Sequence, residues 1–468
     1  MSSSLDVTRG HGSRLPSSRE GARTGRRAFN AARPVAGRPL RSQSLLSRLT
    51  SLTLVLAVLT ALVLIPSPVV AAPLSQASTP ATATPGAGQI VVHPHTTTSL
   101  EVINARYQTT TLFQFTDSPA ALVQTTDLSG TLALMARDPS IAWFEANNSA
   151  RQPAAKDDSG ADPYCGTSSV VTATTGTSAK DDSGADPHCT RPVANGAQEY
   201  ANQWMDIKVN LSWAHKRTLG QGVTIAVLDT AVESHPALAG KVLPGVDLLA
   251  RDPSTNVPTT GIKRGHGTFV AGVALHVAPG AQVLPVRVLN DDGRGSTSLV
   301  AEGIRQAAKK GARVINMSLS TPTPSRALQE AVAYAQEQGA ILVAAYGNEG
   351  LQAPAVYPAD FPNVLSVVAT DADDTKAKFT NFGRKADVAA PGVNIVAPWR
   401  DGEYGMGSGT SYAAPVVSGQ VALMLTAGTA KRQTDTQDRI IKSVDNIDAL
   451  NGMKLGFGRI NLPAALLR

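Results

Sequence analysis

Four short stretches of the chain carry the side chains that an acyl-transfer reaction needs. A β-rich apolar run ends in the carboxylate of Asp229, and glycines on both sides of His266 place an imidazole at a helix start. A second apolar run leads to the amide of Asn348, and Ser411 stands between a glycine and a long apolar segment. Alone, each could equally be a turn residue or a helix cap. Together they could supply a nucleophile, a base, a carboxylate and an oxyanion donor.

Three of these stretches resemble the sequence boxes of the subtilisin-like serine proteases, the subtilase or peptidase S8 family. Residues 229–232, 266–272 and 409–415 stand where that family has its Asp, His and Ser boxes, in that family's order. The resemblance covers roughly residues 198–468. It departs from the family pattern, without losing a catalytic group, at Ala231, Phe269, Tyr412, Ala414 and Val416. These departures bear on fine substrate preference rather than on the chemistry.

The resemblance implies a role for each of the four polar residues. His266 would take the proton of the Ser411 hydroxyl, a poor nucleophile without a base, and Asp229 would orient the imidazole. The Asn348 side chain and the Ser411 backbone N–H would form the oxyanion hole. No metal takes part in this scheme. The implied activity is a serine endopeptidase that hydrolyses peptide bonds in polypeptides.

Further residues are assigned to substrate binding by the same resemblance. Two segments would clamp an extended peptide as an added strand, and they are Gly293-Arg294-Gly295 and Ser318-Leu319-Ser320. Val356, just before Tyr357-Pro358, would form the floor of the first specificity pocket, with Glu349 at its rim. A β-branched floor predicts small or medium apolar side chains in that pocket.

The positions of the histidines separate rival functions. Gly409, Ser411 and Ala413 nearly match the nucleophile elbow of lipases and esterases, which needs a histidine after the serine. All eight histidines lie at or before His276, so that order is excluded. His235, in a turn context, and His276, after an apolar helix, are interpreted as structural. A non-catalytic binding protein that retained the boxes stays open as an alternative.

The charge of the chain argues against nucleic-acid binding. The formal net charge is +6, but residues 1–72 hold ten arginines and two acids. The rest of the chain therefore carries 32 basic and 34 acidic residues, a net charge of −2. No polybasic surface for phosphate binding is expected.

Five segments are expected along the chain, and the protein is expected to be secreted, extracellular and monomeric. They are a secretory leader (1–72), a Pro/Thr/Ala linker (73–89), a small α+β propeptide-like module (90–150), a repeat-containing linker (151–197) and the protease domain (198–468). The apolar run 52–65 is short for a membrane span and fits a signal peptide, with an uncleaved anchor as the alternative. The module resembles the end of subtilase propeptides, with an unrelated module as its alternative. Self-processing is expected between about Asn148 and Gln198.

The repeat-containing linker has two further features. Residues 155–163 recur as 179–187, and each copy is followed by a cysteine, Cys165 or Cys189, which an exported protein could join in a disulfide. The spacing of its aspartates does not fit a calcium loop. The usual high-affinity calcium loop of subtilases also has no counterpart between Ala274 and Ala278, so no cofactor is expected, and weak calcium sites elsewhere stay open.

Strand and helix signals alternate through the protease region. Strands are expected at 223–228, 282–288, 313–317, 341–345 and 364–369, and helices at 298–310, 326–338 and 411–425. Such alternation predicts a three-layer α/β domain with a parallel sheet. Catalytic groups would gather at the carboxyl ends of its strands.

Overall fold

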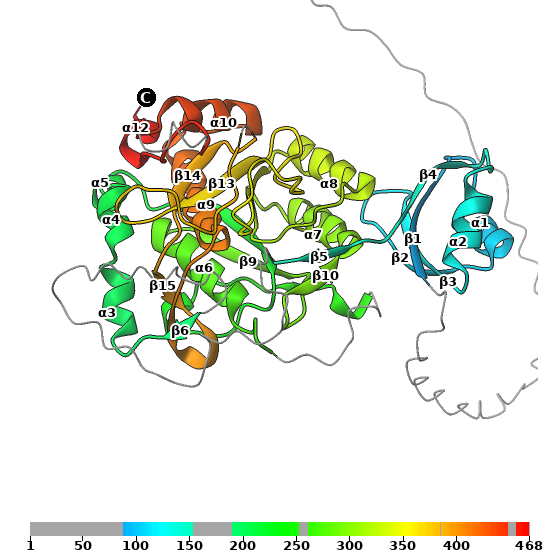
Figure 1. Ribbon diagram of the computed structural model, residues 1–468, viewed down its shortest axis with the longest axis horizontal. Helices are drawn as coiled ribbons and strands as arrows, with labels where there is room; N and C mark the ends of the chain where they lie inside the picture. Colours follow the sequence, from blue (N-terminus) through cyan, green and yellow to red (C-terminus); the bar gives the residue numbers. More distant parts are fainter. Residues whose placement is uncertain (1–87, 153–189, 252–260, 384, 448–454, 468) are drawn as a thin grey trace, which may run out of the picture. The chain divides into compact units, whose positions relative to one another are not determined.

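A parallel sheet organises the protease region of the computed structural model, which describes residues 88–152, 190–251, 261–383, 385–447 and 455–467 (Figure 1). Its strand order is β14-β13-β12-β11-β7-β9-β8. The strands are β7 (Thr224–Asp229), β8 (Val246–Asp247), β9 (Gln282–Arg287), β11 (Val314–Met317), β12 (Ile341–Ala345), β13 (Leu365–Thr370) and β14 (Val388–Pro391). Every pairing between them is parallel.

Helices cover both faces of this sheet. Helices α6 (His266–Val277) and α9 (Thr410–Ala427) share one apolar cluster with Ile225 and Val227. Helices α7 (Thr297–Lys309) and α8 (Arg326–Glu337) share another with Ala226 and Leu228. Successive side chains of a strand point to opposite faces, so an apolar run such as that of β7 is buried on both sides. This is the expected three-layer α/β architecture.

The strand order changes direction beside β7. From β7 the chain passes through α6 to β9 on one side, whereas β11 lies on its other side and β12 to β14 continue outward from there. Sites in such sheets form at the carboxyl ends of the strands where the order reverses. Asp229 is the last residue of β7 and therefore lies at that point.

The expected elements are present, with ends shifted by one or two residues in most cases. Helix α9 begins at Thr410 with Gly409 as its N-cap, so neither Thr410 nor Ser411 is the cap. Pro415 is the sixth residue of that helix rather than part of its first turn. Proline lacks the backbone N–H that a helix interior uses, and its ring usually kinks the helix, but α9 continues through Pro415.

The N-terminal part that the structure describes is a separate antiparallel sheet. Its order is β2-β3-β1-β4, from β1 (Gly88–Pro94), β2 (Thr110–Gln114), β3 (Ala121–Thr125) and β4 (Ile141–Ala146). Helices α1 (Leu100–Tyr107) and α2 (Leu128–Met135) pack on one face, around Ile90 and Ile103. The other face, which includes Phe113 and Trp143, joins the apolar cluster of α7 and α8.

Shorter elements complete the described residues. They are β5 (Ser149–Arg151), β6 (Arg191–Pro192), α3 (Gly196–Ala201), α4 (Trp204–Lys208), α5 (Leu211–His215), η1 (Pro236–Leu238), η2 (Leu249–Arg251), β10 (Arg294–Ser296), β15 (Ile395–Pro398), η4 (Arg400–Gly402), β16 (Tyr404–Gly407), α10 (Gln433–Lys442) and α12 (Leu462–Leu466). Strands β15, β16 and β6 form a small antiparallel sheet. None of the described helices is long and apolar enough to cross a membrane. The expected leader, residues 73–87 of the first linker and both cysteines lie outside the described residues, whereas Gly88 and Gln89 of that linker belong to β1.

Candidate active site

Asp229 and His266 meet at the carboxyl edge of the central strand. The Nδ1 atom of His266 lies 2.8 Å from Oδ1 of Asp229, and both residues are buried. An ionised carboxylate only accepts hydrogen bonds, so Nδ1 carries the proton and Nε2 is the basic nitrogen. The Thr230 N–H donates to the same carboxylate oxygen at 2.7 Å. The carboxylate is therefore held on its own strand and fixes the orientation of the ring.

The glycine before His266 is required by the local backbone. Gly265 has φ +89°, a conformation that glycine adopts without strain. A Cβ at this position would also lie 2.8 Å from a ring atom of Trp399. These two constraints explain why the histidine follows a glycine at the first residue of α6.

Ser411 enters the site as the second residue of α9. Its hydroxyl donates to the carbonyl oxygen of Ser318 at 3.5 Å, and within the described part of the chain no hydrogen bond joins it to His266. Nucleophile–base hydrogen bonds are often loose before substrate is in place. The Ser411 backbone N–H lies in the first turn of α9, where helical N–H groups have no partner in their own helix.

Asn348 is held beside this helix start by its carbonyl end. Its Oδ1 accepts from the Thr410 N–H at 2.9 Å and from the Thr410 hydroxyl at 2.8 Å. The other end of the same planar amide carries its N–H donors. Because Thr410 precedes Ser411, the structure brings the Asn348 amide next to the helix start that carries Ser411.

A buried polar chain behind Ser411 was missed from the sequence. The Ser318 hydroxyl donates to the Ser411 carbonyl at 2.8 Å and lies 3.0 Å from the donating Nδ2 of Asn316. The Ser418 hydroxyl in turn donates to Oδ1 of Asn316 at 2.8 Å. All three side chains are fully buried. A polar residue inside an apolar strand and another inside an apolar helix were the signals that could have pointed to it.

The two predicted clamp segments hold an extended piece of the chain itself. Strand β5 pairs antiparallel with β10, with Ala150 opposite Gly295 and Arg151 opposite Arg294. On its other side, Arg151 exchanges two backbone hydrogen bonds with Ser320, at 3.0 and 2.7 Å. Gly295 has no room for a side chain, because a Cβ there would lie 2.2 Å from the Val288 carbonyl oxygen.

The bound piece reaches the acid–base pair at Gln152. Its N–H donates to the Gly293 carbonyl oxygen at 3.0 Å, and its side-chain amide lies 3.3 Å from Oδ1 of Asp229. A Cβ on Gly293 would come within 2.9 Å of the Gln152 side chain. Arg151 and Gln152, which the sequence interpretation assigned to a linker, are thus part of the strand in the clamp.

The expected pocket residues have less direct links to the site. Val356 is buried in the apolar cluster of α7 and α8, and Leu319 of the second clamp segment belongs to that cluster too. Glu349 is partly buried and accepts a hydrogen bond from the Asn381 amide at 2.6 Å. Val356 and Leu319 thus belong to the same apolar cluster, and the role of Val356 as the pocket floor stays a prediction.

The other histidines near the protease core hold structural contacts. His235 caps a short 3-10 helix through Nδ1, which accepts from the Ala237 N–H, and its Nε2 contacts the Glu403 carbonyl at 2.9 Å. Burial lowers the pKa of His235. His276 lies 2.6 Å from a carboxylate oxygen of Asp206. Neither contacts Ser411 through a hydrogen bond in the described residues, as the sequence interpretation expected.

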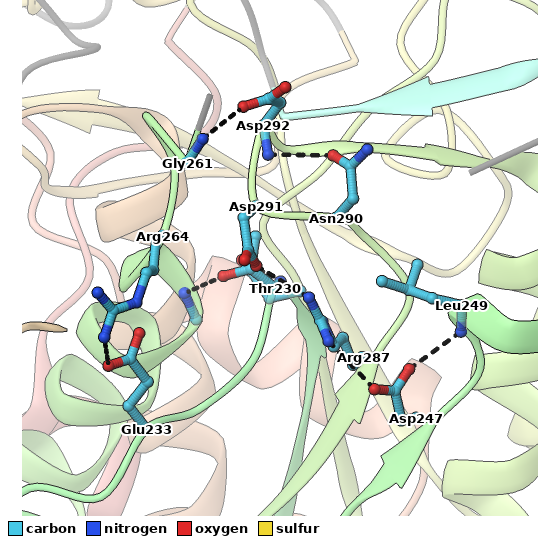
Figure 2. Close-up of polar contacts among 12 residues, drawn as sticks. Thr230, Glu233, Asp247, Leu249, Gly261, Arg264, Arg287, Asn290, Asp291 and Asp292 are labelled. Carbon is cyan, nitrogen blue, oxygen red and sulfur yellow. Dashed lines mark hydrogen bonds and ion pairs between the residues drawn. The ribbon is translucent and has the colours of Figure 1, made fainter. Parts of the chain in front are cut away.

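A polar network borders the site at the ends of β7 and β9 (Figure 2). Arg287 bridges Asp247 and Asp291, at 3.2 and 2.9 Å. Asn290 accepts from the N–H group of Asp292 (Figure 2). It also accepts from the N–H group of Arg294 and so orders the turn that leads into β10. Among the described residues, no group of three metal-binding side chains is close enough to hold an ion.

Comparison with known proteins agrees with this geometry. The subtilase family model matches residues 220–458. Thermitase of Thermoactinomyces vulgaris is 40% identical over 253 residues, which are 52% of this chain and 88% of thermitase. Subtilisin BL of Lederbergia lenta is 35% identical over 272 residues, 56% of this chain and 97% of that protein.

A solved structure gives the same result. A protease from Pseudoalteromonas arctica superimposes with a TM-score of 0.52 at 28% identity, covering 57% of this chain and 97% of that one. The structural similarity to that protease, the family match and the curated relatives favour an enzyme over a non-catalytic binding protein that retained the Asp, His and Ser boxes. The chain belongs to the subtilase family and is a subtilisin-like serine endopeptidase.

Proposed function

We propose that the chain is an inactive precursor of a secreted endopeptidase, and that it cuts itself with Asp229, His266 and Ser411. The observation that carries this proposal is the strand 149–152, hydrogen-bonded between both clamp segments with its end beside Asp229 and His266. Such a strand occupies the position of a polypeptide substrate and would block its binding. The first cut is placed after Gln152 and before Thr190.

Each residue has one part in the proposed reaction. Nε2 of His266 accepts the proton of the Ser411 hydroxyl as its oxygen attacks the carbonyl carbon, and later donates it to the leaving amine. Asp229 accepts from Nδ1 and stabilises the imidazolium. The Asn348 amide and the Ser411 N–H stabilise the negative oxygen, and an amide in this role contributes about a hundred- to a thousandfold in rate in subtilisin.

The module of residues 88–146 supports the precursor assignment through two anchors on the protease helices. The Glu145 carboxylate accepts from the Ser325 hydroxyl and from the N–H groups of Arg326 and Ala327, at the start of α8. The Thr116 N–H and hydroxyl donate to Glu302, a fully buried carboxylate of α7. We infer that this module is the propeptide and that the leader 1–72 directs export, after which the mature enzyme acts as a monomer.

Active-site labelling tests the assignment. A fluorophosphonate should label the wild-type protein and not Ser411→Ala, whereas Ser443→Ala, at the end of α10, should be labelled normally. Purified Ser411→Ala precursor should stay uncleaved, and a trace of wild-type enzyme should cut it. Self-cleavage of Ser411→Ala to the wild-type size, in the absence of any other protease, would show that the proposed nucleophile is wrong.

A further inference from the structure

Tyr412, the residue directly after Ser411, forms one wall of the histidine site. Its side chain is almost completely buried, and its ring centroid lies 5.5 Å from that of His266 and 4.2 Å from that of Phe269. It is one of the positions at which this serine box departs from the family pattern. A change in the position of this ring therefore changes what the imidazole packs against.

The hydroxyl of this tyrosine is bonded to a residue far away in the sequence. The Tyr412 hydroxyl lies 2.8 Å from the Thr190 hydroxyl, 222 positions earlier in the chain. Thr190 lies within the expected repeat-containing linker and is the first described residue after Gln152. Burial raises the pKa of the Tyr412 phenol well above its usual range, so the phenol stays protonated. A buried phenol needs a hydrogen-bond partner, and Thr190 supplies it.

Two glycines of β16 make room for this pair. A Cβ on Gly405 would lie 2.3 Å from the Thr190 methyl group, and a Cβ on Gly407 would lie 2.6 Å from the Tyr412 ring. The segment that carries Thr190 is fixed by backbone hydrogen bonds, because Arg191 and Pro192 of β6 pair with β16. The N–H of Val193 also donates to the Tyr404 carbonyl oxygen at 3.1 Å. Thr190 thus directly precedes a strand that is hydrogen-bonded to β16.

We propose that Tyr412 is a positioning residue for His266 and that Thr190 holds it in the catalytic position. This inference rests on the proposed role of His266 as the base. It adds a condition to maturation: residues 190–193 must stay attached to the protease, so processing has to cut before Thr190. A precursor trimmed beyond Thr190 would lose the partner of the Tyr412 hydroxyl and with it the alignment of the imidazole.

The test is a double-mutant cycle on the full chain, after self-processing. The variants are Thr190→Val, Thr190→Ser, Tyr412→Phe and the double variant Thr190→Val/Tyr412→Phe, with competent sites counted by fluorophosphonate labelling. Thr190→Val leaves a buried phenol without its partner and should lower kcat about three- to thirtyfold with KM unchanged. Thr190→Ser should restore kcat to within about twofold, since a serine hydroxyl can make the same bond.

The cycle separates a positioning role from a structural one. In the Tyr412→Phe background the phenol is gone, so Thr190→Val should change kcat by less than about twofold. Tyr200→Phe is the matched control, because the Tyr200 hydroxyl bonds to the Gly272 carbonyl at 2.8 Å without contacting His266 through its ring. This control should lower the thermal midpoint and leave kcat unchanged.

Three results would overturn the proposal. The first is an equal effect of Thr190→Val on kcat in the wild-type and Tyr412→Phe backgrounds. The second is a Thr190→Val variant that has a lower thermal midpoint but an unchanged kcat, as expected for Tyr200→Phe. The third is an active mature enzyme whose N-terminus, read by mass spectrometry, lies after Thr190. Failure of the proposed function is distinct: it would appear as wild-type protein that the fluorophosphonate does not label at Ser411.

Discussion

Removal of the Glu145 carboxylate should release the propeptide-like module early. This carboxylate accepts three hydrogen bonds at the start of α8, at 2.6, 2.7 and 3.2 Å, where the positive end of the helix dipole also favours a negative charge. A hydrogen bond to a charged group contributes about 1.5–3 kcal/mol net. Glu145 is only partly buried, and water can solvate the freed N–H groups, so we take about 2–3 kcal/mol for the whole anchor.

That free energy predicts a measurable change in activation. A loss of about 2–3 kcal/mol weakens the hold of the module by roughly thirty- to more than a hundredfold. Purified precursor is followed by gel for cleavage and by peptide hydrolysis for activity. Glu145→Ala should shorten the lag between cleavage and full activity at least about tenfold. The lag of Glu145→Gln should lie between those of the wild type and Glu145→Ala, since an uncharged amide oxygen is a weaker acceptor.

A second carboxylate on the same module is the control. Asp117 contacts Lys309 at 2.9 Å and the Tyr334 hydroxyl at 2.7 Å, but the Asp117 and Lys309 side chains are about half exposed. Exposed ion pairs contribute about 0–1 kcal/mol, so Asp117→Ala should shorten the lag by no more than about fivefold. A lag in Glu145→Ala equal to the wild-type lag, or a larger effect of Asp117→Ala, would refute the ranking of the two anchors.

Two further predictions concern the mature enzyme. Val356→Gly should widen P1 acceptance towards aromatic side chains, and a wild-type library profile already dominated by Phe or Tyr would contradict Val356 as the pocket floor. Replacing millimolar calcium with a chelator should shift the thermal midpoint little, because α6 continues without interruption from His266 to Val277 and contains no oxygen-rich loop. A large drop, with calcium bound near residues 272–280, would refute that reasoning.

The sequence was most informative where one local signal determines one local structure. The strand that ends at Asp229 and the helix that begins at His266 were predicted to within a residue, because apolar runs and glycines mark those ends. The clamp segments were placed by family resemblance, and the structure brings both onto one extended strand. These predictions needed no knowledge of long-range contacts.

Contacts between distant parts of the chain could not be predicted in this way. Nothing near Thr190 indicates that its hydroxyl meets Tyr412, and nothing near Glu145 indicates the start of α8. Helix α9 also begins one residue earlier than expected and accommodates Pro415 beyond its first turn. Pairings of this kind depend on how the layers pack, which a single sequence does not encode locally.

The buried chain of polar groups behind Ser411 explains how a mostly apolar, buried helix can orient this serine. Helix α9 is buried on all sides up to Met424, so hydrophobic burial alone does not select which of its faces meets the sheet. The Ser418 hydroxyl reaches Asn316 on β11, and Ser318 from the same segment reaches the Ser411 carbonyl. These bonds tie one face of the helix to β11 and to the segment that follows it. A wrong rotation would leave buried hydroxyl and amide groups unpaired, at a cost of about 1–3 kcal/mol each. The polar chain therefore sets the direction of Ser411, while the apolar side chains supply the stability of the helix.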